Sequence, residues 1–167
     1  MSKRKKDFLE QIDNHINIIR KICNVYCHTG CDKEDLVQDI IYQLWKSFRS
    51  FESRSSFSTW MYRVALNTAI GYTRKKPSKP IDQGQELSLA SMVEDEPDEM
   101  TFMVESLYDA IGRLMSIDKA IIMLWLEKKS YREISEVTGL SEKNVSVRLV
   151  RIRSRLRELL KDLEFKI

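Results

Sequence analysis

The sequence predicts an all-α protein made of two small helical domains joined by a flexible acidic linker. Apolar residues recur at helical spacing through most of the 167-residue chain, and no alternating pattern of strand length competes. Gly and Pro number only five and three, which disfavours turn-rich β architecture. Residues 77–100 contain all three prolines and lack sustained periodicity, so they separate a domain at 5–76 from one at 101–163.

The first two helices are expected at residues 5–28 and from Asp32 to about Phe48. The helical period of the first range breaks at Gly30, and Asp32 is expected to be the N-cap of the second helix. The polar face of that second helix is rich in acids and amides, at Glu34, Asp35, Gln38, Asp39 and Gln43. Such a strip either faces solvent or binds another protein.

A third helix is expected from Phe57 to Lys76, after a Ser-rich loop and a cap at Ser56. Its polar surface carries rings, cations and an amide with no acid nearby, at Tyr62, Arg63, Asn67, Tyr72, Arg74 and Lys75. These groups match single-stranded nucleic acid, because rings stack on exposed bases and cations follow the backbone. The alternative is that the rings belong to the core of the bundle.

The C-terminal domain contains a helix-turn-helix pattern. Helical spacing resumes at Thr101, and Ser116 is expected to cap the next helix. Ser130 and Glu133 form a capping box at the start of a third helix, which Gly139 can end in the left-handed conformation. Two helices joined by a short turn containing Gly, the second strongly basic, are typical of a helix-turn-helix.

Ser141 is expected to cap the last helix, whose two faces differ in chemistry. At about 100° per residue, an apolar stripe lies within roughly 40° of Val145 and consists of Leu149, Ile152, Leu156, Leu159 and Leu163. The opposite side carries Lys143, Val147, Val150, Arg151 and Ser154, with Asn144 on one flank. This face suits a major groove, because cations meet phosphates and guanine edges while methyl groups contact thymine. A solvated basic helix is the alternative.

Charge is distributed unevenly along the chain. Residues 53–81 carry six cations and no acid, residues 82–109 carry nine acids and no Lys or Arg, and residues 141–161 carry seven cations and two acids. The three segments are therefore +6, −9 and +5. Two positive regions separated by a negative connector indicate a polyanion contacted at two places.

Three cysteines, Cys23, Cys27 and Cys31, lie beside His28. Their odd number in a chain that looks intracellular argues against a disulfide framework. The spacing of four residues favours small buried thiols on one helix face, with a redox-sensitive group or a metal site as the alternatives. We expect no metal.

The sequence predicts a cytoplasmic protein without direct membrane insertion. The basic N-terminus lacks the apolar core of a signal peptide. The longest fully apolar run, residues 120–126, is too short to span a bilayer.

Two parts of the chain together resemble the sigma-70-like factors of bacteria, specifically the small extracytoplasmic-function (ECF) group. Residues 35–51, DLVQDIIYQLWKSFRSF, and residues 57–76, FSTWMYRVALNTAIGYTRKK, are similar to region 2 of that family. Residues 130–160, SYREISEVTGLSEKNVSVRLVRIRSRLRELL, are similar to region 4. The resemblance assigns residues 5–76 to region 2 and residues 101–163 to region 4. It implies a sigma factor without catalytic residues or cofactor.

The resemblance also implies a role for each polar face. The second helix would bind core RNA polymerase through Asp35, Gln38, Asp39 and Gln43. The third helix, with the loop over residues 52–58, would recognise the −10 element of promoter DNA and hold a flipped non-template base, through Tyr62, Arg63, Asn67, Arg74 and Lys75. The last helix would enter the major groove at the −35 element through Lys143, Asn144, Ser146, Val147, Val150 and Arg151. An anti-sigma factor is a further expected partner.

Two other functions compete with the sigma-factor interpretation. A homodimeric helix-turn-helix regulator would use the same C-terminal reader and bind duplex DNA without polymerase. A metal-dependent enzyme built on Cys23, Cys27, His28 and Cys31 would need an acid–base group beside them, and the sequence offers none. A separate hypothesis is that the acidic linker covers the chain's own basic helices in the free protein.

Overall fold

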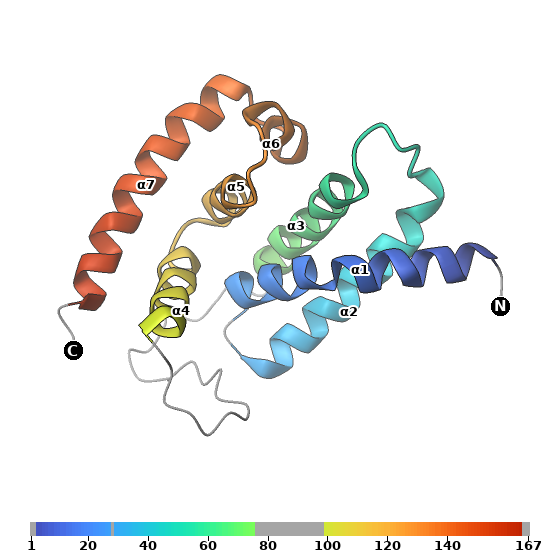
Figure 1. Ribbon diagram of the computed structural model, residues 1–167, viewed down its shortest axis with the longest axis horizontal. Helices are drawn as coiled ribbons and strands as arrows, with labels where there is room; N and C mark the ends of the chain where they lie inside the picture. The colour runs from blue at the N-terminus through green and yellow to red at the C-terminus, as the bar shows by residue number, and fades with distance from the viewer. Residues whose placement is uncertain (1–2, 28, 76–98, 165–167) are drawn as a thin grey trace.

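The computed structural model describes residues 3–27, 29–75 and 99–164, which form α-helices, one short 3₁₀ helix and no strand (Figure 1). The elements in order are α1 (Lys3–Tyr26), α2 (Gly30–Ser47), η1 (Phe48–Ser50), α3 (Phe57–Lys75), α4 (Glu99–Gly112), α5 (Ser116–Leu126), α6 (Tyr131–Thr138) and α7 (Glu142–Glu164). The all-α prediction is confirmed.

The N-terminal half consists of α1, α2 and α3, packed as a three-helix bundle. Thr29, and not Asp32, is the N-cap of α2, because the Thr29 Oγ1 accepts a hydrogen bond from the Asp32 backbone N–H at 3.2 Å. Asp32 lies in the first turn, where the helix dipole favours a carboxylate. Ser56 starts α3 as expected, since its Oγ accepts a hydrogen bond from the Thr59 N–H at 3.2 Å.

The C-terminal half consists of α4 to α7. The capping box at the start of α6 is present, and the Glu133 pKa is lowered chiefly by the hydrogen bond from the Ser130 backbone N–H. Gly139 ends α6 with a φ of 75°, in the left-handed region. The Ser141 Oγ accepts a hydrogen bond from the Asn144 N–H at 3.2 Å, which caps α7 as expected.

The expected cap at Ser116 is wrong. Met115 is the N-cap of α5 and makes no side-chain capping bond. Ser116 instead contacts the N-terminal half, because its carbonyl oxygen accepts a hydrogen bond from the Tyr26 hydroxyl at 2.6 Å. Its hydroxyl lies 3.3 Å from the Thr73 Oγ1 of α3. A residue with good capping propensity is therefore used to join the two halves.

Residues 76–98 lie outside the described residues, and with them most of the expected linker and the short helical turn expected near 87–92. The end of the expected linker differs from the structure. α4 begins at Glu99 and not at Thr101, so the last two residues assigned to the linker are helical.

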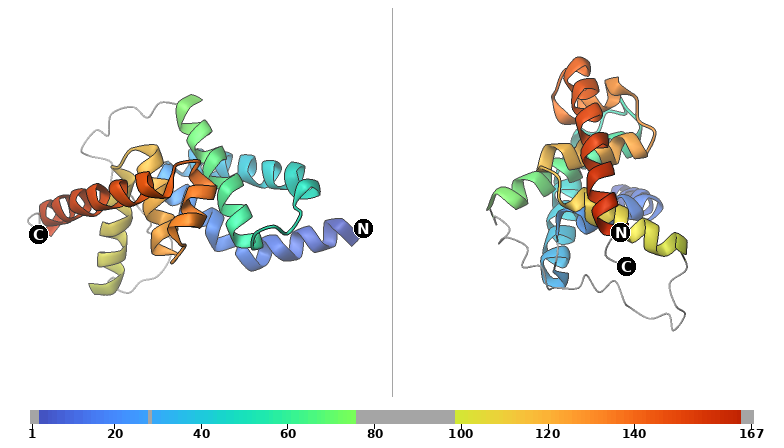
Figure 2. Two further views of the ribbon diagram at one scale, coloured as in Figure 1. Left: turned by 90° about the horizontal axis from the view of Figure 1, so that it is seen from above. Right: turned by 90° about the vertical axis from the view of Figure 1, so that its left-hand side faces the viewer.

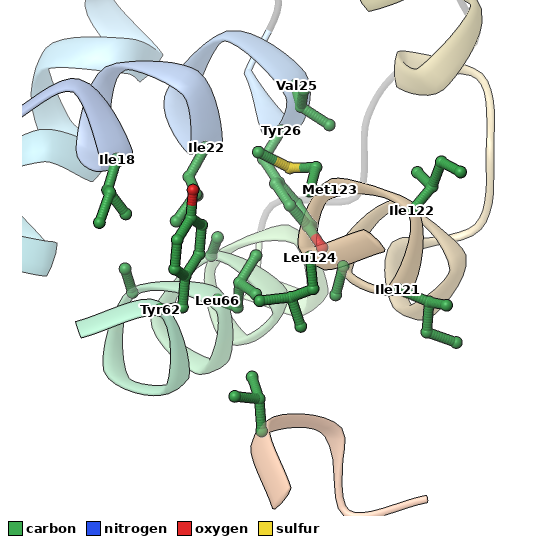
Figure 3. Close-up of a cluster of buried hydrophobic side chains, with 14 of the residues drawn as sticks. Ile18, Ile22, Val25, Tyr26, Tyr62, Leu66, Ile121, Ile122, Met123 and Leu124 are labelled. Carbon is green, nitrogen blue, oxygen red and sulfur yellow. The ribbon is translucent and has the colours of Figure 1, made fainter. Parts of the chain in front are cut away.

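The two halves share one hydrophobic core, with α5 at its centre. Residues 119–124 of α5 are all buried, as expected of a helix that is covered on every side. Met123 and Leu124 lie among Val25 and Tyr26 of α1 and Leu66 of α3 (Figure 3). The two halves therefore pack against each other as one body in this structure.

Polar contacts frame this shared core. The Lys21 Nζ of α1 lies 2.5 Å from the Glu127 carboxylate, just after α5. The Lys129 Nζ, between α5 and α6, donates a hydrogen bond to the Thr59 Oγ1 at 3.0 Å and another to the Ser58 Oγ at 3.2 Å, and both acceptors lie at the start of α3. The Thr59 hydroxyl also lies 3.3 Å from the Glu133 carboxylate of α6. Each of these contacts joins a residue of the N-terminal half to a residue of the C-terminal half.

The arrangement places α7 and the first turn of α1 at opposite ends of the molecule (Figures 1 and 2). Within the part of the chain that the structure describes, no helix is long and apolar enough to cross a membrane.

Candidate nucleic-acid and protein interfaces

The outer face of α7 is exposed and mixes cations with apolar methyl groups. Val147 and Val150 are 45% and 69% exposed, which is unusual for β-branched apolar side chains. Lys143, Asn144 and Arg151 are exposed beside them, whereas Ser146 is half-buried. Neither Lys143 nor Arg151 forms an ion pair with any described residue. These side chains are therefore available to an external partner.

The inner face of α7 fixes the direction of this outer face. The stripe from Val145 to Leu159 is buried, with Leu149, Ile152 and Leu156 between them, as the helical angles predict. Arg148 adds a polar anchor, because its guanidinium lies 2.8 Å from the Asp118 carboxylate of α5. The Arg153 guanidinium carbon lies 5.3 Å from the centroid of the Trp125 ring. The helix is thus held to α5 by both apolar and charged contacts.

Four of the five expected −10 residues lie on the exposed side of α3. Arg63, Asn67, Arg74 and Lys75 are exposed. Asn67 and Arg74 line a groove of about 430 Å³ between α3 and the beginning of α5. The amide and the guanidinium are separated by two helical turns, so together they offer hydrogen-bond donors and an acceptor along one groove wall.

The expected stacking role of Tyr62 is wrong for this structure. Its side chain is only 2% exposed, and its ring lies between α1 and α3 near Ile22 (Figure 3). The Tyr62 hydroxyl has no hydrogen-bond partner among the described residues. Burial raises the pKa of Tyr62, and the nearby Glu127 carboxylate raises it further. A ring enclosed in this way cannot stack on a base while α1 and α3 remain packed together.

An aromatic cluster in front of α3 was not anticipated. Phe51 lies 5.0 Å from Trp60 and 5.6 Å from Phe57, measured between ring centroids. Phe48 lies 6.4 Å from Trp60. These rings support the loop between η1 and α3, in which Ser53 has a φ of 55°. The sequence placed Phe57 and Trp60 on a buried face but gave no signal that Phe51 would join them.

The acidic and amide-rich strip of α2 is exposed. Asp35, Gln38, Asp39 and Gln43 all lie on the outer side of the helix. Tyr42 and Trp45, which are 59% and 38% exposed, extend the strip with aromatic surface. Exposed aromatic rings beside polar groups are enriched at protein interfaces, so the strip fits a protein partner better than solvent.

The cysteines show no arrangement typical of a metal site. Cys23 and Cys27 are buried, and burial chiefly raises the pKa of the Cys23 thiol to about 12. A thiol with so high a pKa is a poor nucleophile at neutral pH. Among the described side chains, which exclude those of His28 and Cys31, no group of His, Cys, Asp and Glu residues could hold a metal ion.

The structure thus presents cation-bearing faces on α3 and α7 and a polar strip on α2. Two family models match the chain: Sigma-70 region 2 over residues 12–78 and Sigma-70, region 4 over residues 105–156. The chain belongs to the sigma-70 family, as an ECF sigma factor. It directs RNA polymerase to initiate transcription at specific promoters, and it is not an enzyme.

Relatives of known function support this assignment over the chain's length. The ECF RNA polymerase sigma-E factor of Haemophilus influenzae is 27% identical over 161 residues, covering 89% of this chain and 85% of that protein. The ECF RNA polymerase sigma factor SigW of Bacillus subtilis is 27% identical over 168 residues, covering 93% and 90%. The sigma factor RpoE of Bartonella quintana, in a crystal with the anti-sigma factor NepR, has the same fold, with a TM-score of 0.72, 24% identity and coverage of 93% and 98%.

Proposed function

We propose that this chain reads one promoter at two places, with residues 5–76 as region 2, residues 77–100 as the linker and residues 101–163 as region 4. The observation that carries the proposal is the pair of exposed, cation-bearing faces on α3 and α7. A polyanion longer than the protein can contact both faces, and RNA polymerase would fix their separation.

In this proposal, α7 enters the major groove of the −35 element. Lys143 and Arg151 meet phosphates and base edges, Asn144 and Ser146 offer hydrogen bonds, and the methyl groups of Val147 and Val150 contact thymine. Short side chains at positions 146 and 147 bring the helix backbone close to the bases. The exposure of both valines supports this role, because exposed β-branched apolar residues gain free energy when a partner covers them.

The exposed side of α3 would hold the −10 element of the opened strand. Arg63, Arg74 and Lys75 would neutralise phosphates, and Asn67 would read the edge of a flipped base. Tyr62 no longer belongs to this set, because it is buried. Ser58, in the first turn of α3, accepts a hydrogen bond from Lys129 in this structure. Region 4 therefore occupies part of the surface that DNA would use.

We further propose that the two halves separate on the polymerase. Asn67 and Arg74 face a groove whose other wall is α5 and α6, and a DNA strand would compete with that wall. The strip on α2, with Asp35, Gln38, Asp39 and Gln43, is exposed without any such change and would make the first contact with core polymerase. The likeness to a sigma factor crystallised with an anti-sigma factor supports an anti-sigma partner for this chain as well. With core polymerase and promoter DNA as partners, the proposed location is the cytoplasm.

Replacing Gln38 and Asp39 together by alanine should weaken binding to core polymerase by about tenfold or more, because an interface anchor typically contributes above 1 kcal/mol. The affinity of purified protein for core enzyme measures this. The matched control is Asp13→Ala with Asn14→Ala, an exposed acid and amide on α1. Equal affinity of both double variants would contradict the assignment of this strip.

The Arg151→Ala variant should lose discrimination at one base pair of the −35 element, by about 1–3 kcal/mol if the guanidinium contacts a guanine edge at two points. Transcription from promoters with randomised −35 elements measures the loss. Arg155→Ala is the control, since Arg155 lies on the same helix but pairs with Glu158 at 3.1 Å. Unaltered base preference in Arg151→Ala, or the same loss in the control, would remove Arg151 from the base-reading set.

Asn67→Ala should slow promoter opening by roughly tenfold while leaving binding to core polymerase intact, because only the flipped base loses a partner. Permanganate reactivity of unpaired thymines measures the opening. Tyr62→Phe should leave opening unchanged and keep or raise the free energy of unfolding, since it removes a buried hydroxyl without a partner. If Tyr62→Phe slowed opening and Asn67→Ala did not, the two roles assigned here would be reversed.

A further inference from the structure

The first turn of α1 carries four consecutive cations that neither the fold nor the proposed readers use. Lys3, Lys5 and Lys6 are exposed, and Arg4 is half-buried. Lys46 of α2 and Arg49 of η1 are exposed at the same end of the molecule (Figures 1 and 2). We call these six residues the N-terminal basic patch.

Contacts between aromatic rings, and between Arg4 and a ring, fix the position of the start of α1. The Phe8 ring lies 5.1 Å from the Trp45 ring and 5.2 Å from the Phe48 ring, measured between centroids. The Arg4 guanidinium carbon lies 5.1 Å from the centroid of the Trp45 ring. These contacts fix the first turn of α1 against the end of α2. The cations of the first turn of α1 therefore lie at the same end of the molecule as the end of α2 and η1.

The same ring cluster connects the patch to the proposed −10 reader. Phe48 packs on Phe8 at one side and lies 6.5 Å from Phe57, in the first turn of α3, at the other. Phe57 in turn contacts Phe51, in the loop that precedes α3. A strand held on α3 and its loop would need to cross only this aromatic cluster to reach the patch.

Electrostatics within the fold disfavour these cations. The backbone N–H groups at a helix N-terminus already carry partial positive charge, so cations there are unfavourable, and neighbouring like charges repel. α1 has no acid in its first turn. None of Lys3, Lys5, Lys6, Lys46 and Arg49 forms an ion pair with a residue that the structure describes. Asp7 and Glu10, one turn further along α1, offset only part of this repulsion, and an external anion would offset more of it.

We propose that the N-terminal basic patch binds the phosphate backbone of promoter DNA next to the −10 segment, which extends region 2 beyond its α3 surface. This inference rests on the proposed function, because it takes α3 as the −10 reader. Phosphates require only charge, and flexible lysines supply it. Lysine is depleted at protein–protein interfaces, which makes an acidic surface of the polymerase the less suitable partner.

The test compares holoenzymes that carry the wild-type chain or the Lys5→Gln, Lys6→Gln double variant. The probe is a fork-junction DNA, with a single-stranded −10 segment, from a promoter that the wild-type holoenzyme transcribes. Affinity is measured over a range of salt concentrations. The plot of log K against log salt should become shallower by about 1.4–1.8, because each phosphate contact contributes about 0.7–0.9. The double variant should also melt at a higher temperature, because repulsion at the helix start is relieved.

Two controls separate charge from position. Lys5→Arg with Lys6→Arg retains the charges and should keep the wild-type slope. Arg20→Gln with Lys128→Asn removes two exposed charges elsewhere and should also keep it. An unchanged slope in the Lys5, Lys6 glutamine variant would overturn the inference, and so would weaker binding to core polymerase, which would show a protein contact. If the wild-type holoenzyme itself failed to bind the fork, the proposed function would fail instead.

Discussion

The burial of α5 is the constraint on which the rest of the structure depends. Six consecutive residues, Lys119 to Leu124, are inaccessible to solvent, so every side of this helix needs a neighbour. The other three helices of the C-terminal half cover only part of it, and α1 and α3 cover the remainder. This explains why region 2 and region 4 share one core although the sequence separates them with a polar, proline-containing segment.

The same burial links the two DNA readers. Lys119 is buried with its ammonium group 5.3 Å from the Tyr26 ring centroid, and burial lowers the Lys119 pKa. Separation of the halves would return this charge to water and free Ser58 from Lys129, and these changes partly offset the loss of apolar contacts. A closed form that can open in this way would keep region 4 beside Ser58 and the groove at Asn67 and Arg74 until the polymerase and DNA supply better contacts.

The features that could be predicted from the sequence are those set by local chemistry. The stripe on α7 and the capping box at Ser130 follow from helical periodicity and neighbouring side chains, and both are confirmed. The predictions that fail concern residues whose burial or hydrogen bonds are set by a distant segment of the chain. Tyr62 has a position on α3 that looks suitable for stacking, but α1 encloses it. Ser116 has the chemistry of a cap, yet Tyr26 and Thr73 take its polar groups. No local pattern in the sequence shows which helices from the other half will pack nearby.

Energy transfer between fluorophores attached at Asn14 of α1 and Ser154 of α7, both exposed, measures whether the two halves share one core in the free protein and separate on the polymerase. If they do, the distance is short in the free protein and becomes longer after core polymerase is added. The same distance in both states, or halves already apart in the free protein, would rule out the proposed opening.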